Sequence, residues 1–76
     1  MSLEVGRVCY KTKGRSQGNK VVVLEHLKNG FVLIEGISTK RKNCNPRELF
    51  PTPQKIDVKK ETKRDAIVKM LKETGA

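Results

Sequence analysis

The chain has 76 residues, and its 17 Lys and Arg outnumber its 8 Asp and Glu to give a formal net charge of +9. This length allows one small domain, and such a charge points to a polyanion, either nucleic acid or an anionic membrane surface. A membrane is the weaker choice, because no apolar run reaches the ~18 residues of a membrane span and the first residues lack the apolar segment of a secretory signal.

The two cysteines, Cys9 and Cys44, give no sign of a metal site or of a disulfide framework. They are isolated thiols, with no CxxC pair and no clustered histidines, so we expect neither a metal nor another cofactor. Their number and spacing agree with an intracellular, reducing setting. Cys9 lies inside an apolar run and is predicted to be a small core residue.

The first half of the chain predicts short strands joined by turns. Two strands are expected at Val5–Lys11 and Lys20–Leu27, separated by a basic, glycine-rich loop at Thr12–Asn19. The second strand is apolar enough to be covered on both faces. Asn29-Gly30 then predicts a tight turn with both residues at φ > 0, which leads into a third strand at Phe31–Glu35.

The middle of the chain is more polar. Lys40–Asn45 is expected as a fourth, polar strand with Cys44 facing inward, and Pro46–Phe50 as a single turn that caps the sheet with Leu49 and Phe50. Pro51 and Pro53 enforce an extended path. Lys55–Val58 alternates in polarity and is predicted to be the fifth strand.

From Thr62 onward the apolar period becomes helical. Thr62 and Asp65 have the spacing of a capping box, and one apolar stripe contains Ala66, Ile67, Met70 and Leu71. A helix this short must dock to be stable. We therefore predict a mainly β fold, a small barrel of about five strands over residues 1–58, with a linker and short C-terminal helix over residues 59–76 packed on it.

The loop after the first strand is the first candidate binding site. No acidic residue occurs between positions 5 and 24, and four cations there are expected to meet phosphate oxygens: Lys11, Lys13, Arg15 and Lys20. Gly14 and Gly18 would let the backbone approach closely. The alternative is a loop made soluble by its charge. The spacing is not that of a P-loop, so nucleotide hydrolysis has no support.

The second candidate site is the run KRKNCNPR. Cations in it would neutralise phosphates and amides would bond to sugars or base edges; the residues concerned are Lys40, Arg41, Lys42, Asn43, Asn45 and Arg47. The alternative is that the charges only protect a sheet edge from aggregation.

Aromatic and catalytic residues are scarce. Phe31 and Phe50 are expected in the core, and Tyr10 is compatible with either core or surface, so recognition is expected to use backbone and shape rather than base stacking. His26 is the single histidine and lies in the strongest strand. It lacks the neighbours of a catalytic base, so no catalytic residue is predicted.

The sequence VGRVCYKTKGRSQGNKVVVLE, with glycines at 6, 14 and 18, resembles a KOW motif. The succession NGFVLIEG, KRKNCNP and ELFPTPQKIDV is similar to the large-subunit ribosomal protein family numbered fourteen in the archaeal and eukaryotic series, over about residues 3–58. The resemblance implies an SH3-like barrel bound to ribosomal RNA, without catalysis. By position it carries over to Gly14, Arg15, Gly18, Lys40, Arg41, Lys42 and Asn45.

The match to this family has departures. The link after Gly36 is short, and Phe50 stands where a charged residue is expected. The long basic extension of eukaryotic members is missing after the helix, so the archaeal type of the family is the better match.

We therefore predict a structural constituent of the large ribosomal subunit, in the cytoplasm and not an enzyme. Its expected partners are ribosomal RNA and neighbouring ribosomal proteins, with no membrane and no small-molecule substrate, and it is expected to be a monomer when isolated. Two alternatives stay open. One is a KOW module of a transcription or chromatin factor that binds duplex DNA, and the other is a protein-interaction adaptor, favoured if the helix stripe is exposed.

Overall fold

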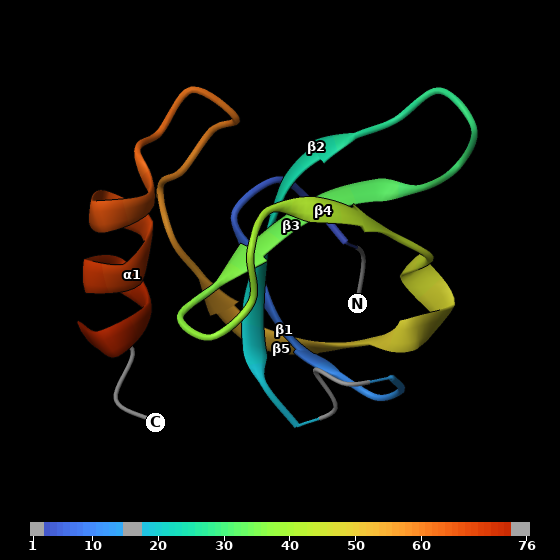
Figure 1. The fold of residues 1–76 in the computed structure, drawn as a ribbon, viewed down its shortest axis with the longest axis horizontal. Helices are drawn as coiled ribbons and strands as arrows, with labels where there is room; N and C mark the ends of the chain where they lie inside the picture. The colour runs from blue at the N-terminus through green and yellow to red at the C-terminus, as the bar shows by residue number, and fades with distance from the viewer. Residues whose placement is uncertain (1–2, 15–17, 74–76) are drawn as a thin grey trace.

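The computed structural model describes residues 3–14 and 18–73. Five strands, a one-turn 3-10 helix and one α-helix follow one another along the chain (Figure 1): β1 Arg7–Lys11, β2 Lys20–His26, β3 Val32–Gly36, β4 Lys42–Cys44, η1 Pro46–Glu48, β5 Leu49–Lys55 and α1 Arg64–Glu73. The predicted mainly β fold with a C-terminal helix is confirmed.

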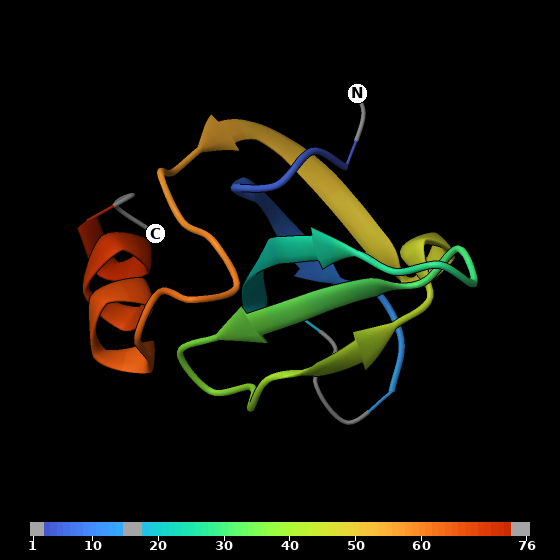
Figure 2. The ribbon, with the colours of Figure 1, turned by 90° about the horizontal axis from the view of Figure 1, so that it is seen from above.

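The strands form one antiparallel sheet in the order β4-β3-β2-β1-β5. The sheet curls strongly, so that β4 and β5 face each other across its hollow side (Figures 1 and 2). Within the described residues, no ladder pairs β4 with β5. The hydrogen-bonded closure of a full barrel is therefore not observed, and η1 connects the two edge strands instead.

The alternating side chains of the strands build two apolar clusters, one on each face of the sheet. The concave face holds Cys9, Val21, Val23, Val32, Ile34, Cys44 and Leu49, which come from all five strands. The convex face holds Val8, Val22 and Leu24 with Val58, and α1 covers them with Ile67 and Leu71. The expectations that β2 is covered on both faces and that Cys9 is a core residue are both confirmed.

The fifth strand lies earlier than predicted, because Pro51 and Pro53 are inside it. Proline is tolerated on an edge strand, where its missing N–H need not pair. Side chains replace part of the lost ladder: the Thr52 hydroxyl donates to the Val8 carbonyl at 2.7 Å, and the Arg7 guanidinium donates to the Thr52 carbonyl at 3.1 Å.

Three local predictions are wrong. Gly30 has a φ of 85°, but Asn29 does not share its positive φ; instead the Asn29 side chain accepts the Phe31 N–H at 3.2 Å, so the turn is not of the predicted type. The predicted capping box is not formed by Thr62, because its hydroxyl accepts from the N–H of Lys59, which precedes the helix, at 2.9 Å. Phe31 and Phe50, expected in the core, are 39% and 62% exposed.

One buried carboxylate fastens the helix and its linker to the sheet. Glu35 of β3 is 3% exposed and accepts from Arg41 at 3.0 Å and from Arg64 at 2.9 Å. Each arginine also donates to backbone carbonyls, Arg41 to those of Lys60 and Thr62, and Arg64 to those of Ile37 and Thr39. We call this group the Glu35 clasp. These charge-assisted hydrogen bonds compensate for the burial of the Glu35 charge, and they connect the linker and α1 to the sheet.

The Glu35→Ala variant should lose about 2–3 kcal/mol of unfolding free energy in urea denaturation. Removing one partner of a buried pair costs about 3–5 kcal/mol, and the partial exposure of both arginines lowers that cost. Glu25→Ala is the matched control, because Glu25 pairs with Lys60 at 3.4 Å on the surface. It should cost less than about 1 kcal/mol, and equal losses in the two variants would contradict the clasp.

Candidate nucleic-acid interface

The basic loop is closed at its base by two backbone hydrogen bonds. The Lys11 N–H donates to the Asn19 carbonyl at 3.0 Å, and the Gly18 N–H donates to the Lys11 carbonyl at 2.7 Å. Gly14 and Gly18 have φ values of 82° and 85°, and both are exposed with open space where a Cβ would stand. Glycine is therefore required there by the backbone conformation rather than by crowding. Lys13 is exposed, and Arg15 lies outside the described residues.

Lys11 points into the protein, although the sequence analysis placed it among the phosphate-binding cations. Its side chain is 4% exposed, and its Nζ lies 2.7 Å from Glu48 Oε1 and 3.5 Å from Cys44 Sγ. Burial alone would lower the pKa of this amine, but the contacts with Glu48 and Cys44 outweigh burial and raise its pKa. Lys11 therefore stays charged and holds β1 against the 3-10 turn.

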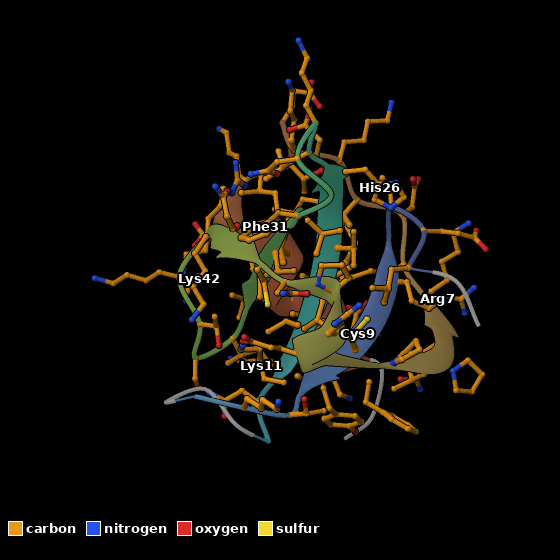
Figure 3. The ribbon with its side chains drawn as sticks, turned by 90° about the vertical axis from the view of Figure 1, so that its right-hand side faces the viewer. Arg7, Cys9, Lys11, His26, Phe31 and Lys42 are labelled. Atoms are coloured by element: carbon orange, nitrogen blue, oxygen red, sulfur yellow. The ribbon has the colours of Figure 1, made fainter. Side chains whose placement is uncertain are left out.

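The exposed residues of the run 40–47 are Lys40, Arg41, Lys42, Asn43 and Arg47. Arg41 differs from the others because its guanidinium donates to Glu35 in the Glu35 clasp. The Asn45 side chain caps η1 by accepting the Arg47 N–H at 3.0 Å. Figure 3 shows Lys42 at the outer margin of the molecule and Lys11 nearer its middle.

The two basic segments approach each other around Glu48. The Thr12 N–H donates to the Glu48 carbonyl at 2.9 Å, and Lys11 in β1 pairs with Leu49 in β5. The hydrogen bond from Lys11 and its charge lower the pKa of the Glu48 carboxyl, and the charges of Lys13 and Lys42 lower it further. A lysine from each segment is thus within electrostatic range of one carboxylate, and we call the exposed surface around it the Glu48 junction.

Lys20 differs from the other predicted contacts because it lies beside an aromatic ring. Its Nζ is 5.9 Å from the centroid of the Tyr10 ring, within cation–π range. Lys20 thus belongs to the start of β2, next to Gly18 and Asn19, rather than to the loop tip.

Sequence reasoning missed the roles of Glu48 and Phe50. Glu48 is the single acidic residue between positions 36 and 56. A lone carboxylate among so many cations indicates that it forms an ion pair with one of them. Phe50 follows Leu49 at the start of a strand, where alternation sends one of two adjacent apolar residues outward. Leu49 is buried, so Phe50 is the exposed one.

The described residues offer little for other chemistries. They contain no group of three or more His, Cys, Asp or Glu side chains arranged to hold a metal ion. The helix that they include is too short and too polar to cross a membrane. Burial is the main cause that raises the pKa of Cys9 to about 11; the charge of Arg7 lowers this pKa, and Cys44 raises it. The Cys9 thiol is therefore protonated and unreactive at neutral pH.

Curated relatives match nearly the whole chain. It is 42% identical over 74 residues to the large ribosomal subunit protein eL14 of Methanococcus maripaludis strain C6, covering 97% of this chain and 95% of that protein. It is 37% identical over 78 residues to the eL14 protein of Saccharolobus islandicus strain L.S.2.15, covering 97% and 81%. No family model matches the chain.

The Lys11–Glu48 contact should make stability depend on pH at both extremes. Its contribution is complete above the ordinary Glu pKa of about 4.3 and is lost as pH falls through the lowered folded value. It is also complete below the ordinary Lys pKa of about 10.4 and is lost as pH rises through the raised folded value.

Glu48→Gln should therefore flatten the acid limb in urea denaturation measured across pH. Lys11→Met should remove the same part of the dependence, and the double variant should add nothing further, because both changes delete one interaction. Additive effects of the two substitutions would contradict a direct contact.

Proposed function

The chain belongs to the eL14 family of large ribosomal subunit proteins, and on this basis we propose that the Glu48 junction binds the phosphates of ribosomal RNA. The protein is a structural component of the cytoplasmic ribosome and not an enzyme. Its partners are ribosomal RNA and other ribosomal proteins.

The observation that carries the proposal is the meeting of two cationic segments that are far apart in the sequence. The Lys11–Glu48 contact at 2.7 Å and the Thr12–Glu48 backbone bond at 2.9 Å hold the basic loop against the turn that follows the second segment. Exposed lysines held on a rigid scaffold neutralise phosphates without first having to be ordered. Such a surface suits a place where RNA backbones converge and repel each other.

We propose that the predicted cations have two different tasks. Lys13, Lys40, Lys42 and Arg47 are exposed and are proposed to meet phosphates, with Asn43 beside them and Arg15 on the same loop. Lys11 pairs with Glu48 and Arg41 pairs with Glu35, and we propose that these two cations hold the scaffold. Arginine and lysine contacts to phosphate position a protein but read no sequence, so the junction should bind with little base preference.

The protein-adaptor alternative depended on an exposed helix stripe. Ile67 and Leu71 are fully buried against the sheet and Met70 is partly buried. The described part of the helix therefore offers no apolar face to a protein partner.

Binding of large-subunit ribosomal RNA fragments should weaken steeply with salt. If about five phosphates are neutralised, the slope of log affinity against log salt should be near −4. Lys13→Gln and Lys42→Gln should each reduce the steepness of this slope by about 0.7–0.9, measured by filter binding.

Lys69→Gln is the control for charge, because Lys69 is exposed on α1, on the far side of the molecule from η1 (Figure 1). It should leave the slope unchanged. Arg41→Gln should lower stability without changing the slope. A wild-type slope near zero would remove the proposal, and duplex DNA competing as well as ribosomal RNA would favour the DNA-binding alternative.

A further inference from the structure

A row of three side chains crosses the convex face of the sheet beside the basic loop. Tyr10 in β1 is paired with Phe50 in β5 on one side and with Lys20 in β2 on the other. Directly paired residues project to the same face of a sheet, so the order across the sheet is Phe50, Tyr10, Lys20. Ile37 lies just beyond the end of β3, in the turn closed by the Gly36–Thr39 hydrogen bonds, and lines the same hollow as Lys20. We call these four residues the aromatic platform.

The platform lies on a part of the convex face that stays partly exposed beside the described helix, Arg64–Glu73. Val8 and Val22, one side-chain step along the same face, are buried beneath α1. Phe50 and Ile37 are among the exposed large apolar residues, and Tyr10 is partly exposed. The partly exposed Tyr10 and the exposed Phe50 are therefore open to contact by a partner.

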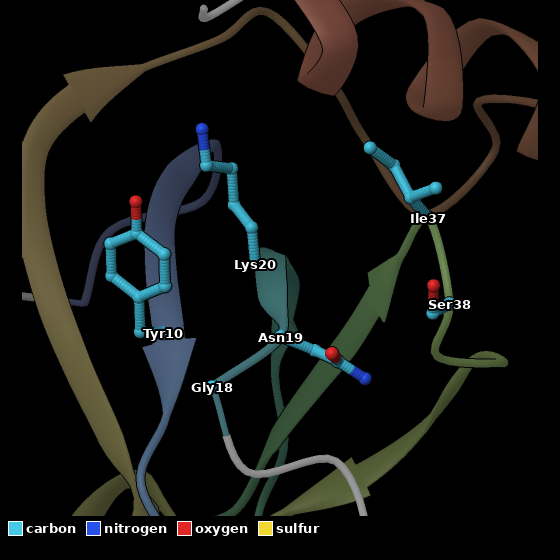
Figure 4. Close-up of a pocket in the computed structure, with 6 residues that line it drawn as sticks. All are labelled: Tyr10, Gly18, Asn19, Lys20, Ile37 and Ser38. Atoms are coloured by element: carbon cyan, nitrogen blue, oxygen red, sulfur yellow. The ribbon is translucent and has the colours of Figure 1, made fainter. Parts of the chain in front are cut away.

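The middle of the platform is hollowed rather than flat. A hollow of about 290 Å³ is lined by Tyr10, Gly18, Asn19, Lys20, Ile37 and Ser38. Figure 4 shows the Tyr10 ring beside the Lys20 side chain, with Asn19 and Ser38 at the rim. The platform therefore combines ring faces, a cation and two side chains able to hydrogen-bond.

We propose that the aromatic platform stacks an unpaired base of the RNA strand whose phosphates meet the basic loop. This inference rests on the proposed function, and it adds a base contact to a surface otherwise limited to phosphates. The basic loop and the aromatic platform are adjacent along the chain, because the loop ends with Gly18 and Asn19 and Lys20 follows directly. A strand leaving the loop with its backbone against the cations would bring a base over Tyr10 and Phe50.

Charge selects a nucleotide rather than an apolar protein segment as the occupant. Lys20 lines the hollow, and four of its six lining residues come from positions 5–24, a stretch that has no acidic residue. Ring faces beside a cation and a backbone-tracking basic groove are the parts with which proteins bind single-stranded nucleic acid.

The test uses the full chain and two fluorescent RNA probes of about ten nucleotides, a length within the range of such sites. One is oligouridylate, and the other has the same backbone with abasic riboses. Both have the same phosphates, so their difference in affinity isolates the bases. Stacking contributes on the order of 5- to 100-fold per base. The wild-type protein should therefore prefer oligouridylate by at least ~5-fold, and Phe50→Ala should remove most of that preference.

Phe31→Ala is the matched control, because it deletes an exposed phenylalanine that lies outside the platform. It should keep the preference, and Phe50→Trp should keep or increase it because the ring face is larger. Thermal unfolding checks that each variant is folded. Equal binding of the two probes by wild type, with a steep salt slope, would overturn the stacking site and leave the phosphate surface intact. Binding of neither probe together with no binding of ribosomal RNA would overturn the proposed function itself.

Discussion

The contact between Lys11 and Glu48 is the interaction on which the binding surface depends. It joins the end of β1, where the basic loop begins, to the turn that follows the second basic segment, and the Thr12–Glu48 backbone bond reinforces it. Without it, two cationic segments would repel each other across the opening of the curled sheet. One half-exposed carboxylate thus offsets repulsion that the fold itself creates, while leaving Lys13 and Lys42 exposed to a polyanion.

A second carboxylate, Glu35, stabilises the part of the molecule that carries α1. Glu35 is almost fully buried and would be costly alone, but two arginines and four backbone carbonyls complete its network. The clasp fixes the linker and α1 over the convex face, where Ile67 and Leu71 pack against Val8 and Val22. The contacts of Glu48 and Glu35 therefore determine which cations have structural partners and which cations remain exposed. The distribution of charge along the sequence does not distinguish these two kinds of cation.

Much of the fold was predictable because local patterns agreed with it. The continuous apolar run of β2, the glycine at position 30 and the stripe around Ile67 each indicated the element that forms. The errors arose where a distant partner decides the outcome. Pro51 and Pro53 argue against a strand until β1 is seen to pair with it at the sheet edge, and Phe50 is outward because Leu49 fills the interior. The pairing of Lys11 with Glu48 and of Arg41 with Glu35 joins residues that lie far apart along the chain or on different elements, so the sequence does not show which cation each carboxylate binds. The family resemblance was visible in the sequence, since it rests on the order of short motifs.

Amine reactivity in intact large subunits tests most directly whether the Glu48 junction faces ribosomal RNA. Acetylation by a water-soluble reagent, read by mass spectrometry, should modify Lys13 and Lys42 rapidly in the free protein and slowly in the subunit, with reactivity restored after nuclease digestion of the RNA. Lys11 should react slowly in both states because it is buried. Lys13 and Lys42 reacting as fast in the subunit as in the free protein would contradict the account.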